Sequence, residues 1–471
     1  MFVDTQTETS MRSLANVRHE VFWLDDPTRP VARPPLQAHI TADLCVVGGG
    51  FSGLWTAVLA KQQHPNWRVV LLEGDQVASG ATGRNGGFCA ASLTHGLANG
   101  MSRWPGEMPI LLQLGRENLD AIEVFVADHG IDCEFVRSGD LAIATEAYQV
   151  ADLIEHCEAG NALGLSLEFL ADESLKSRVD SPTYLAGLFD GAGTAMVNPA
   201  RLAWGLARVA TDLGVEIHEH SPVSTMSDKL ATVSVFTISG SVAASRVALA
   251  TNAYPPLLRR ISNYVVPVYD YVLMSEPLSN EQRSLVGWDG REGLSDSGNQ
   301  FHYYRITEEG RILWGGYDAI YHSGNGFGKE HEVDDASFQR LAAHFFQTFP
   351  QLAGLEFTHA WGGAIDTCSR FSAFWGKAHG GKTVYVTGYT GLGVGASRFG
   401  AQVMLDLLAG RETARTKLQM VRRKPKPFPP EPLRSIGIDW TTRSLKSADR
   451  NFGRRNLWLR TLDRLGLGFD S

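Results

Sequence analysis

The glycine-rich segment at residues 42–53, ADLCVVGGGFSG, is the part of this chain that most constrains its fold. An apolar strand must turn sharply into a helix here, and Gly48 can adopt backbone angles that a side chain would forbid. Gly50 lets the main chain approach a pyrophosphate, and Gly53 lets the helix and the strand pack closely. The segment therefore predicts a dinucleotide-binding unit near the N-terminus.

The residues that follow complete this unit. Phe51 and Ser52 open the predicted helix, whose free backbone N–H groups and positive dipole end would face the diphosphate. A second apolar strand at residues 68–72 leads to Glu73, which would accept hydrogen bonds from an adenosine ribose. A plain surface carboxylate is the alternative for Glu73. The strand, turn, helix and acid together make a stronger signal than the glycines alone.

Length and composition limit the class of protein. A chain of 471 residues suits two domains, and 44% hydrophobic with 20% charged residues indicates a soluble globular protein. No apolar run is long enough to span a membrane, and residues 1–20 are too polar for a secretory signal, so we expect a cytoplasmic location. Five cysteines without C-x-x-C spacing indicate free thiols. A net charge of -8 argues against nucleic-acid binding.

A second glycine-rich segment, ASGATGRNGG at residues 78–87, calls for a large ligand. Its backbone donors and small hydroxyls suit a pyrophosphate and a planar ring, which favours a flavin over a nicotinamide. A mobile surface loop is the alternative. The predicted ligand contacts in this segment are Gly80, Ala81, Thr82, Arg84, Asn85, Gly86 and Gly87.

A third glycine-rich turn, TGYTGLGVG at residues 387–395, follows an apolar strand and precedes a helix that runs to Leu408. It therefore predicts another helix N-terminus with backbone N–H groups available to a ligand. The predicted contacts are Gly391, Leu392, Gly393 and Val394. A simple loop between strand and helix is the alternative.

These three segments, together with LATNAY at residues 249–254, resemble successive signatures of the D-amino-acid-oxidase superfamily of flavoenzymes. The resemblance spans most of the chain. Two further segments, FHYYRIT at residues 301–307 and WGGAID at residues 361–366 with Arg370, are most similar to the γ-glutamylputrescine-oxidase-like branch.

The resemblance implies a mixed α/β fold in which a Rossmann-like FAD-binding domain is interleaved with an antiparallel-sheet substrate domain. It implies contacts from Val223 near the adenine, from Thr251 and Asn252 beside the cofactor, and from the third turn to the flavin pyrimidine edge. Cys368 does not fit the motif that attaches flavin in related enzymes, so we expect non-covalent FAD. The expected units are an N-terminal arm (1–40), an FAD domain (41–95, 195–255 and 360–420), a substrate domain (96–194 and 256–359) and a C-terminal extension (421–471).

Substrate chemistry is harder to predict because hydride transfer from an amine carbon needs positioning more than acid–base groups. A dry aromatic pocket would lower the pKa of the amine. The candidate catalytic residues are Tyr269, Tyr271, Tyr303, Arg305 and Trp361, with Trp314 and Tyr317 as further aromatic candidates. Core packing is the alternative for these aromatics. Arg305 would either clamp an anionic group of the substrate or tie the sheet to a neighbouring acid.

Two strands at residues 301–307 and 311–317 are predicted to form a hairpin, with His302 and Tyr304 on one face and Tyr303 and Arg305 on the other. The sequence HEH at residues 218–220 is not expected to bind a metal, since alternation along a strand puts its carboxylate on the face opposite the histidines.

The two ends of the chain carry further expectations. The proline-containing residues 27–35 suggest an extended arm. Residues 422–432 suggest a stiff spacer, and Trp458, Leu462 and Leu465 then fall at helical spacing. That helix is expected to dock on its own protein. Binding to a membrane surface or a partner is the alternative, because basic residues flank the apolar stripe.

The sequence thus predicts an FAD-dependent oxidase of a small amine or amino acid, which releases an imine and reduces oxygen to hydrogen peroxide. Residues 312–316 lack the lysine that some related secondary-amine oxidases use to activate oxygen, so a dehydrogenase with another electron acceptor stays open. A flavin-binding subunit without catalysis is the third possibility. The sequence does not predict which amine is used or the oligomeric state.

Overall fold

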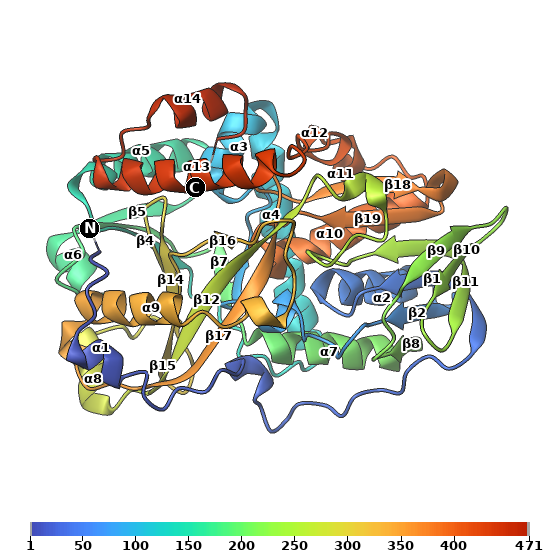
Figure 1. Ribbon diagram of the computed structural model, residues 1–471, viewed down its shortest axis with the longest axis horizontal. Helices are drawn as coiled ribbons and strands as arrows, with labels where there is room; N and C mark the ends of the chain where they lie inside the picture. Colours follow the sequence, from blue (N-terminus) through green and yellow to red (C-terminus); the bar gives the residue numbers. More distant parts are fainter. Residues whose placement is uncertain (1, 469–471) are drawn as a thin grey trace.

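The computed structural model describes residues 2–468, and two large sheets stand side by side in it (Figure 1). The first sheet has a parallel centre whose strands come from distant parts of the chain. In spatial order this centre consists of β19 (Thr383–Thr387), β11 (Ser241–Leu249), β1 (His39–Val47), β2 (Val69–Leu72) and β8 (Val215–His218). Three antiparallel strands complete the sheet. β18 (Phe374–Ala378) pairs with β19, β10 (Val233–Phe236) pairs with β11, and β9 (Thr225–Asp228) pairs with β10.

Three helices cover one face of the first sheet. They are α2 (Phe51–Gln63), α7 (Pro199–Asp212) and α10 (Gly393–Leu408), and their apolar residues share one hydrophobic core. Strands β2 and β19 are buried along their whole length because both faces of the sheet are covered. The strand, turn and helix predicted at the N-terminus are confirmed as β1 and α2, and those predicted near the C-terminus as β19 and α10.

The second sheet has nine strands and is mostly antiparallel. They are β4 (Asp140–Ala144), β5 (Leu167–Ala171), β6 (Ala186–Asp190), β12 (Val266–Pro277), β13 (Gly293–Asp296), β14 (His302–Ile306), β15 (Arg311–Gly316), β16 (Ile320–Tyr321) and β17 (Phe357–Thr367). The predicted hairpin is confirmed as β14 and β15. A small separate sheet pairs β3 (Phe88–Ala90) with β7 (Thr194–Met196).

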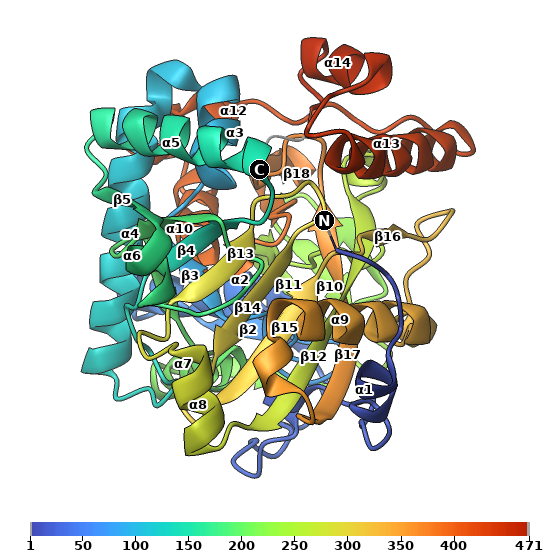
Figure 2. The same cartoon turned by 90° about the vertical axis from the view of Figure 1, so that its left-hand side faces the viewer.

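Helices flank the second sheet on both sides. α9 (Asp335–Thr348) packs against β12 and shares a core with it, whereas α5 (Ala147–Ala162) packs beside β4, β5 and β6 (Figure 2). Shorter helices connect these elements: α3 (Gly96–Arg103), α6 (Asp172–Lys176), α8 (Asn280–Val286), α11 (Ala414–Lys417) and α12 (Gln419–Arg422).

Two elements lie elsewhere than the predicted domain limits suggest. α4 (Met108–Asp128) follows residue 96 but buries Leu119 and Ile122 in the core of the first sheet, beside α10. β17 continues beyond residue 360, yet it pairs with β12 of the second sheet along its length. The two-domain α/β architecture itself is as predicted.

Both ends of the chain pack on the body. α1 (Glu8–Arg12) lies against α9, and Trp23 is buried and donates a hydrogen bond from Nε1 to the carbonyl of Asn85 at 2.9 Å. α13 (Leu433–Arg450) and α14 (Leu457–Arg464) lie across the end of the molecule that also carries α3 and α5 (Figure 2). None of the helices within residues 2–468 combines the length and the apolar character needed to span a bilayer.

Candidate active site

A cavity of about 1770 Å³ extends from the glycine-rich turns of the first sheet to the face of the second sheet. Sites for one small ligand usually measure about 300–1,000 Å³, so this cavity has room for a large cofactor and a second molecule. The predicted cofactor residues that line it are Gly48, Gly50, Phe51, Ser52, Glu73, Gly80, Ala81, Thr82, Arg84, Asn85, Gly86, Val223, Thr251, Asn252, Gly391, Leu392, Gly393 and Val394.

Gly53 and Gly87 are the two predicted cofactor residues that do not line the cavity. A Cβ on Gly53 would lie 1.8 Å from the carbonyl oxygen of Gly48, and a Cβ on Gly87 would lie 2.2 Å from that of Val197. Both glycines therefore permit close packing of the backbone behind the cavity. Gly48 has a φ of +111°, which favours glycine, and a Cβ there would meet the carbonyl oxygen of Ala250 at 2.4 Å.

Glu73 lies where the sequence predicts the ribose contact. Its carboxylate accepts hydrogen bonds from the backbone N–H groups of Gly49 at 2.5 Å and Asp75 at 2.9 Å. Burial raises the pKa of Glu73, and these two donors oppose the shift because they favour the ionised form. The carboxylate is thus fixed at the cavity edge by the turn that it follows.

Side chains hold the second glycine-rich segment in place. Asn85 donates from Nδ2 to the carbonyl oxygens of Ala81 at 3.0 Å and Thr82 at 2.7 Å. Arg84 donates to the carbonyl of Gly362 at 3.0 Å and pairs with Glu332 at 2.9 Å. These contacts fix a loop that would otherwise be open to conformational change.

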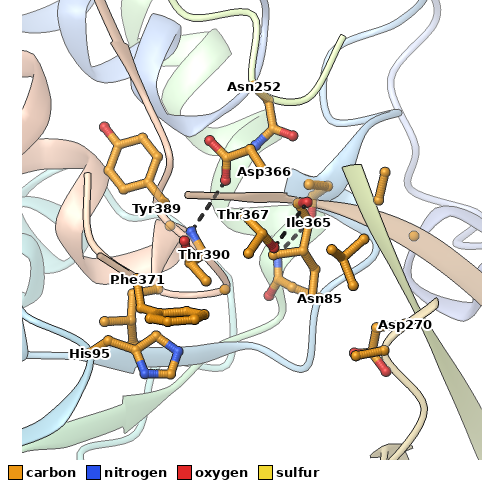
Figure 3. Close-up of a pocket in the computed structure, with 18 of the residues that line it drawn as sticks. Asn85, His95, Asn252, Asp270, Ile365, Asp366, Thr367, Phe371, Tyr389 and Thr390 are labelled. Carbon is orange, nitrogen blue, oxygen red and sulfur yellow. Dashed lines mark hydrogen bonds between the residues drawn. The ribbon is translucent and has the colours of Figure 1, made fainter. Parts of the chain in front are cut away.

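Asp366 organises the third turn, and the sequence analysis did not single it out as a site residue. Its carboxylate accepts hydrogen bonds from the backbone N–H of Gly388 at 2.6 Å and from the hydroxyl of Thr387 at 3.2 Å. It also accepts one from the backbone N–H of Thr390 at 3.3 Å (Figure 3). Burial raises the pKa of Asp366 to about 6. The first and third turns are also joined directly, since Ser52 Oγ donates to the Tyr389 hydroxyl at 2.9 Å.

The wall opposite these turns belongs to the second sheet. Asp270, Phe301 and Tyr303 line it, whereas the ring of Tyr317 packs in the second core on His302 at 5.0 Å and His344 at 4.5 Å. The Tyr303 hydroxyl donates to Asp270 Oδ2 at 2.6 Å, and a Cβ on Gly86 would lie 2.9 Å from the Tyr303 ring. Tyr303 therefore links the predicted ligand loop to the substrate sheet. As predicted, Tyr303 lies on the face of β14 opposite His302 and Tyr304, which are buried in the second core.

Four candidate catalytic residues lie outside the cavity lining. Tyr269 and Tyr271 point into the second core, where their hydroxyls donate to the carbonyl oxygens of Gly328 at 3.2 Å and His331 at 3.0 Å. They occupy the opposite face of β12 from Asp270, because side chains alternate along a strand. Trp314 packs in the same core.

Arg305 and Trp361 have supporting positions. Arg305 is fully buried and donates from Nη1 to the carbonyl of Val197 at 2.6 Å, so it joins β14 to the segment after β7 rather than facing the cavity. Trp361 is buried and donates from Nε1 to the carbonyl of Arg84 at 2.8 Å, which holds the second glycine-rich segment from behind.

Neither the histidine motif nor Cys368 reaches the cavity. Glu219 accepts hydrogen bonds from the backbone N–H groups of Val77 at 2.6 Å and Arg33 at 2.5 Å, so it anchors the N-terminal arm. Among residues 2–468, no group of three or more His, Cys, Asp or Glu side chains is arranged to hold a metal ion. Cys368 is fully buried, and its thiol donates to the carbonyl of Ser372 at 3.2 Å.

The C-terminal extension roofs the cavity. Apolar residues of α13 and α14 line it, among them Leu433, Ile436, Trp440, Trp458 and Leu462. The rings of Trp440 and Trp458 meet edge to face at 5.7 Å, and Trp458 Nε1 donates to the hydroxyl of Thr441 at 3.0 Å. The predicted docking of this segment on its own protein is what the structure shows; we call α13 and α14 the cap.

Residues 43–407 match the family described as DAO, FAD dependent oxidoreductase. The chain belongs to this family. It is 31% identical to gamma-glutamylputrescine oxidoreductase of Escherichia coli, over 80% of this chain and 85% of that protein. It is 28% identical to the probable oxidoreductase OrdL of Haemophilus influenzae, over 83% of this chain and 88% of that one. The crystal structure of glycine oxidase from Geobacillus kaustophilus has the same fold, with a TM-score of 0.67 and 20% identity over 80% of this chain and 96% of that one.

FAD is accordingly the cofactor of this chain, and the cavity suits it. The three glycine turns expose backbone N–H groups at two helix N-termini, α2 and α10, which attract negative charge. Gly50 leaves no room for a side chain, since a Cβ there would meet Thr82 Oγ1 at 2.8 Å. The cap lies beyond the end of the family match at residue 407.

Proposed function

We propose that this DAO family oxidoreductase oxidises the carbon–nitrogen bond of a small primary or secondary amine or amino acid. The substrate carbon would give a hydride to bound FAD, and water would hydrolyse the resulting imine to a carbonyl compound and an amine or ammonia. Oxygen would then take the electrons and form hydrogen peroxide. The similarity to the E. coli gamma-glutamylputrescine oxidoreductase supports the amine class.

The observation that carries the proposal is the division of the cavity into two walls. Glycine turns and helix N-termini form one wall, where a dinucleotide would bind through the backbone. Aromatic side chains and the carboxylate of Asp270 form the other. A substrate held between the walls would be oriented and shielded from water, which is the main protein contribution to hydride transfer.

In this arrangement the cofactor contacts come from the eighteen predicted residues that line the cavity, whereas Gly53, Gly87 and Trp361 support them from behind. Tyr303 is the candidate catalytic residue that we retain on the substrate side, with Phe301 beside it on the same wall. Their rings would exclude water around the amine, which lowers its pKa and so favours the neutral form that can lose a hydride. We also propose that FAD is bound non-covalently.

An anaerobic absorbance titration tests this proposal. The purified yellow protein is titrated with 1,4-diaminobutane, its γ-glutamyl derivative, N-methylglycine and glycine while the oxidised flavin band is followed. We expect one of these compounds to bleach the band, and admission of air to restore it with stoichiometric hydrogen peroxide.

The other outcomes are equally informative. Bleaching without peroxide on admission of air would indicate a dehydrogenase with another electron acceptor. A flavin that light reduces but that none of these amines bleaches would contradict the proposed oxidation and favour a non-catalytic flavin-binding subunit.

A further inference from the structure

Asp270 is a half-buried carboxylate on the substrate wall of the cavity. It lies on β12 directly across from Gly363 of β17, and Figure 3 shows it apart from the turn that carries Thr390. Its Oδ2 accepts the hydrogen bond of the Tyr303 hydroxyl, and its Oδ1 accepts one from the backbone N–H of Tyr271 at 2.7 Å. Both contacts are donors to the carboxylate, and they favour its ionised form.

The charges around Asp270 do not neutralise it. Arg84, which packs against Gly363, is paired with Glu332. Arg340 of α9 is paired with Asp318, and Lys446 of the cap lies 3.8 Å from the same carboxylate. Within the described part of the chain, Asp270 takes part in no ion pair.

The local environment makes this lone carboxylate unusual. Burial raises the pKa of Asp270 to about 7, and the negative charge of Asp318 adds to the shift. A charge that is withdrawn from water is costly unless it is paired. At a position with a purely structural role we would therefore expect a neutral side chain, or a carboxylate with a cationic neighbour. Phe301 and Tyr303 line the same wall, and the faces of aromatic rings attract cations.

We propose that Asp270 binds the ammonium group of the substrate, with Tyr303 as the residue that positions its carboxylate. This inference rests on the proposed function and narrows its substrate class to amines that arrive as cations. The ammonium would pair with the ionised carboxylate as the substrate binds. It would then give one proton to Asp270, so that the bound amine reaches the neutral form that can lose a hydride. Recognition would then depend on the positive charge of the substrate rather than on a carboxylate group.

A cation that cannot be oxidised tests this binding apart from catalysis. tert-Butylammonium has no hydrogen on the carbon that bears nitrogen, and tert-butanol is its neutral counterpart. Calorimetric titration of the FAD-loaded enzyme should show binding of the cation. In Asp270→Asn this binding should weaken about 100-fold, because loss of one partner of a buried charge pair usually has effects of this size. Binding of tert-butanol should not change.

Asp140→Asn is the matched control. Asp140 is a second half-buried carboxylate of the cavity lining. It accepts a hydrogen bond from the hydroxyl of Thr194, and desolvation raises its pKa to about 6. The control should bind tert-butylammonium within about threefold of the wild type. Any of three results would overturn the inference. The wild type and Asp270→Asn could bind the cation equally, the two variants could lose binding equally, or the wild type could fail to bind the cation.

The pH dependence gives a test that survives if Asp270→Asn does not fold. Binding of tert-butylammonium should weaken as the pH falls through about 7, because protonation neutralises Asp270. Tyr303→Phe removes a donor to the ionised form, so it should move the midpoint to higher pH. If the pH midpoint of tert-butylammonium binding were the same in Tyr303→Phe as in the wild type, the inference would be overturned. The amine titration reports the proposed function separately, since the flavin can still bleach when Asp270 has no part in binding.

Discussion

The two walls of the cavity are built from different parts of the polypeptide. The cofactor wall consists largely of backbone. Gly48 in this wall and Gly53 behind it are placed where a Cβ would strike another main-chain atom. The substrate wall consists of side chains, among them Asp270 and Tyr303, that project from a continuous sheet. A binding site made of backbone groups leaves a recognisable pattern in the sequence because few residue types fit its geometry. A binding site made of side chains leaves a weaker pattern because each residue can be changed separately.

The largest effect is expected from a substitution that disrupts the cofactor wall. In Gly53→Ala the new Cβ would lie 1.8 Å from the Gly48 carbonyl oxygen, so α2 and the first turn must separate. We expect the purified variant to be colourless and not to be reconstituted by added FAD. The ratio of flavin to protein absorbance measures this. Gly106→Ala is the control, since no atom lies within 4 Å of a Cβ at that position. A yellow Gly53→Ala protein would show that the backbone contact can relax.

The next effect tests how a side chain supports the cofactor wall. Asp366→Ala leaves the buried N–H groups of Gly388 and Thr390 without their acceptor, and each such group costs about 1–3 kcal/mol. We expect the free energy of unfolding to fall by about 3 kcal/mol in urea titrations, and FAD to bind at least about tenfold more weakly. Thr367→Ala, at the next position of β17, should change neither quantity appreciably. Similar urea concentrations at the midpoint of unfolding for the two variants would contradict this role of Asp366.

The same contrast explains what the sequence could predict. The three glycine turns, the strands before them and the helices after them were predicted because each turn is local and its backbone geometry selects glycine. Asp366 was missed as a site residue because it acts on a turn that begins more than twenty residues later in the chain, through a contact that only the fold brings together. No local pattern distinguishes it from any other acid in a strand.

The substrate wall was predicted less well because it depends on the face of each strand. Tyr269 and Tyr271 were chosen as aromatic candidates on β12, and alternation places both on one face. That face turned out to be the core face, so Asp270 between them faces the cavity. A shift of one residue exchanges the two faces, and a single sequence gives no signal for which face meets the cofactor. On β14 the correct partition of faces was predicted, yet Arg305 lies beyond the cavity although it shares the face of Tyr303.

A smaller effect is expected at the cap, which belongs to neither wall. Trp440→Ala removes an edge-to-face contact with Trp458 and part of the apolar roof. Such aromatic pairs contribute about 0.5–1.5 kcal/mol, so the concentration of the bleaching amine that half-reduces the flavin should rise severalfold at unchanged FAD content. Phe452→Ala is the control, because Phe452 is exposed between α13 and α14 and does not line the cavity. Equal changes in the two variants would show that the roof has no part in binding.

The smallest effect is expected at Cys368, which tests whether the cofactor wall holds FAD without a covalent bond. The thiol is fully buried outside the cavity lining, and its single S–H lies within hydrogen-bonding distance of the carbonyl oxygens of Ser372 and Gly388. Acid precipitation of the wild-type protein should therefore release all of its flavin, and Cys368→Ala should bind FAD with the wild-type affinity. Flavin that stays with the precipitated wild type but leaves the variant would establish a covalent bond at this cysteine. Full release from both proteins would establish that the folded chain holds FAD without a covalent bond.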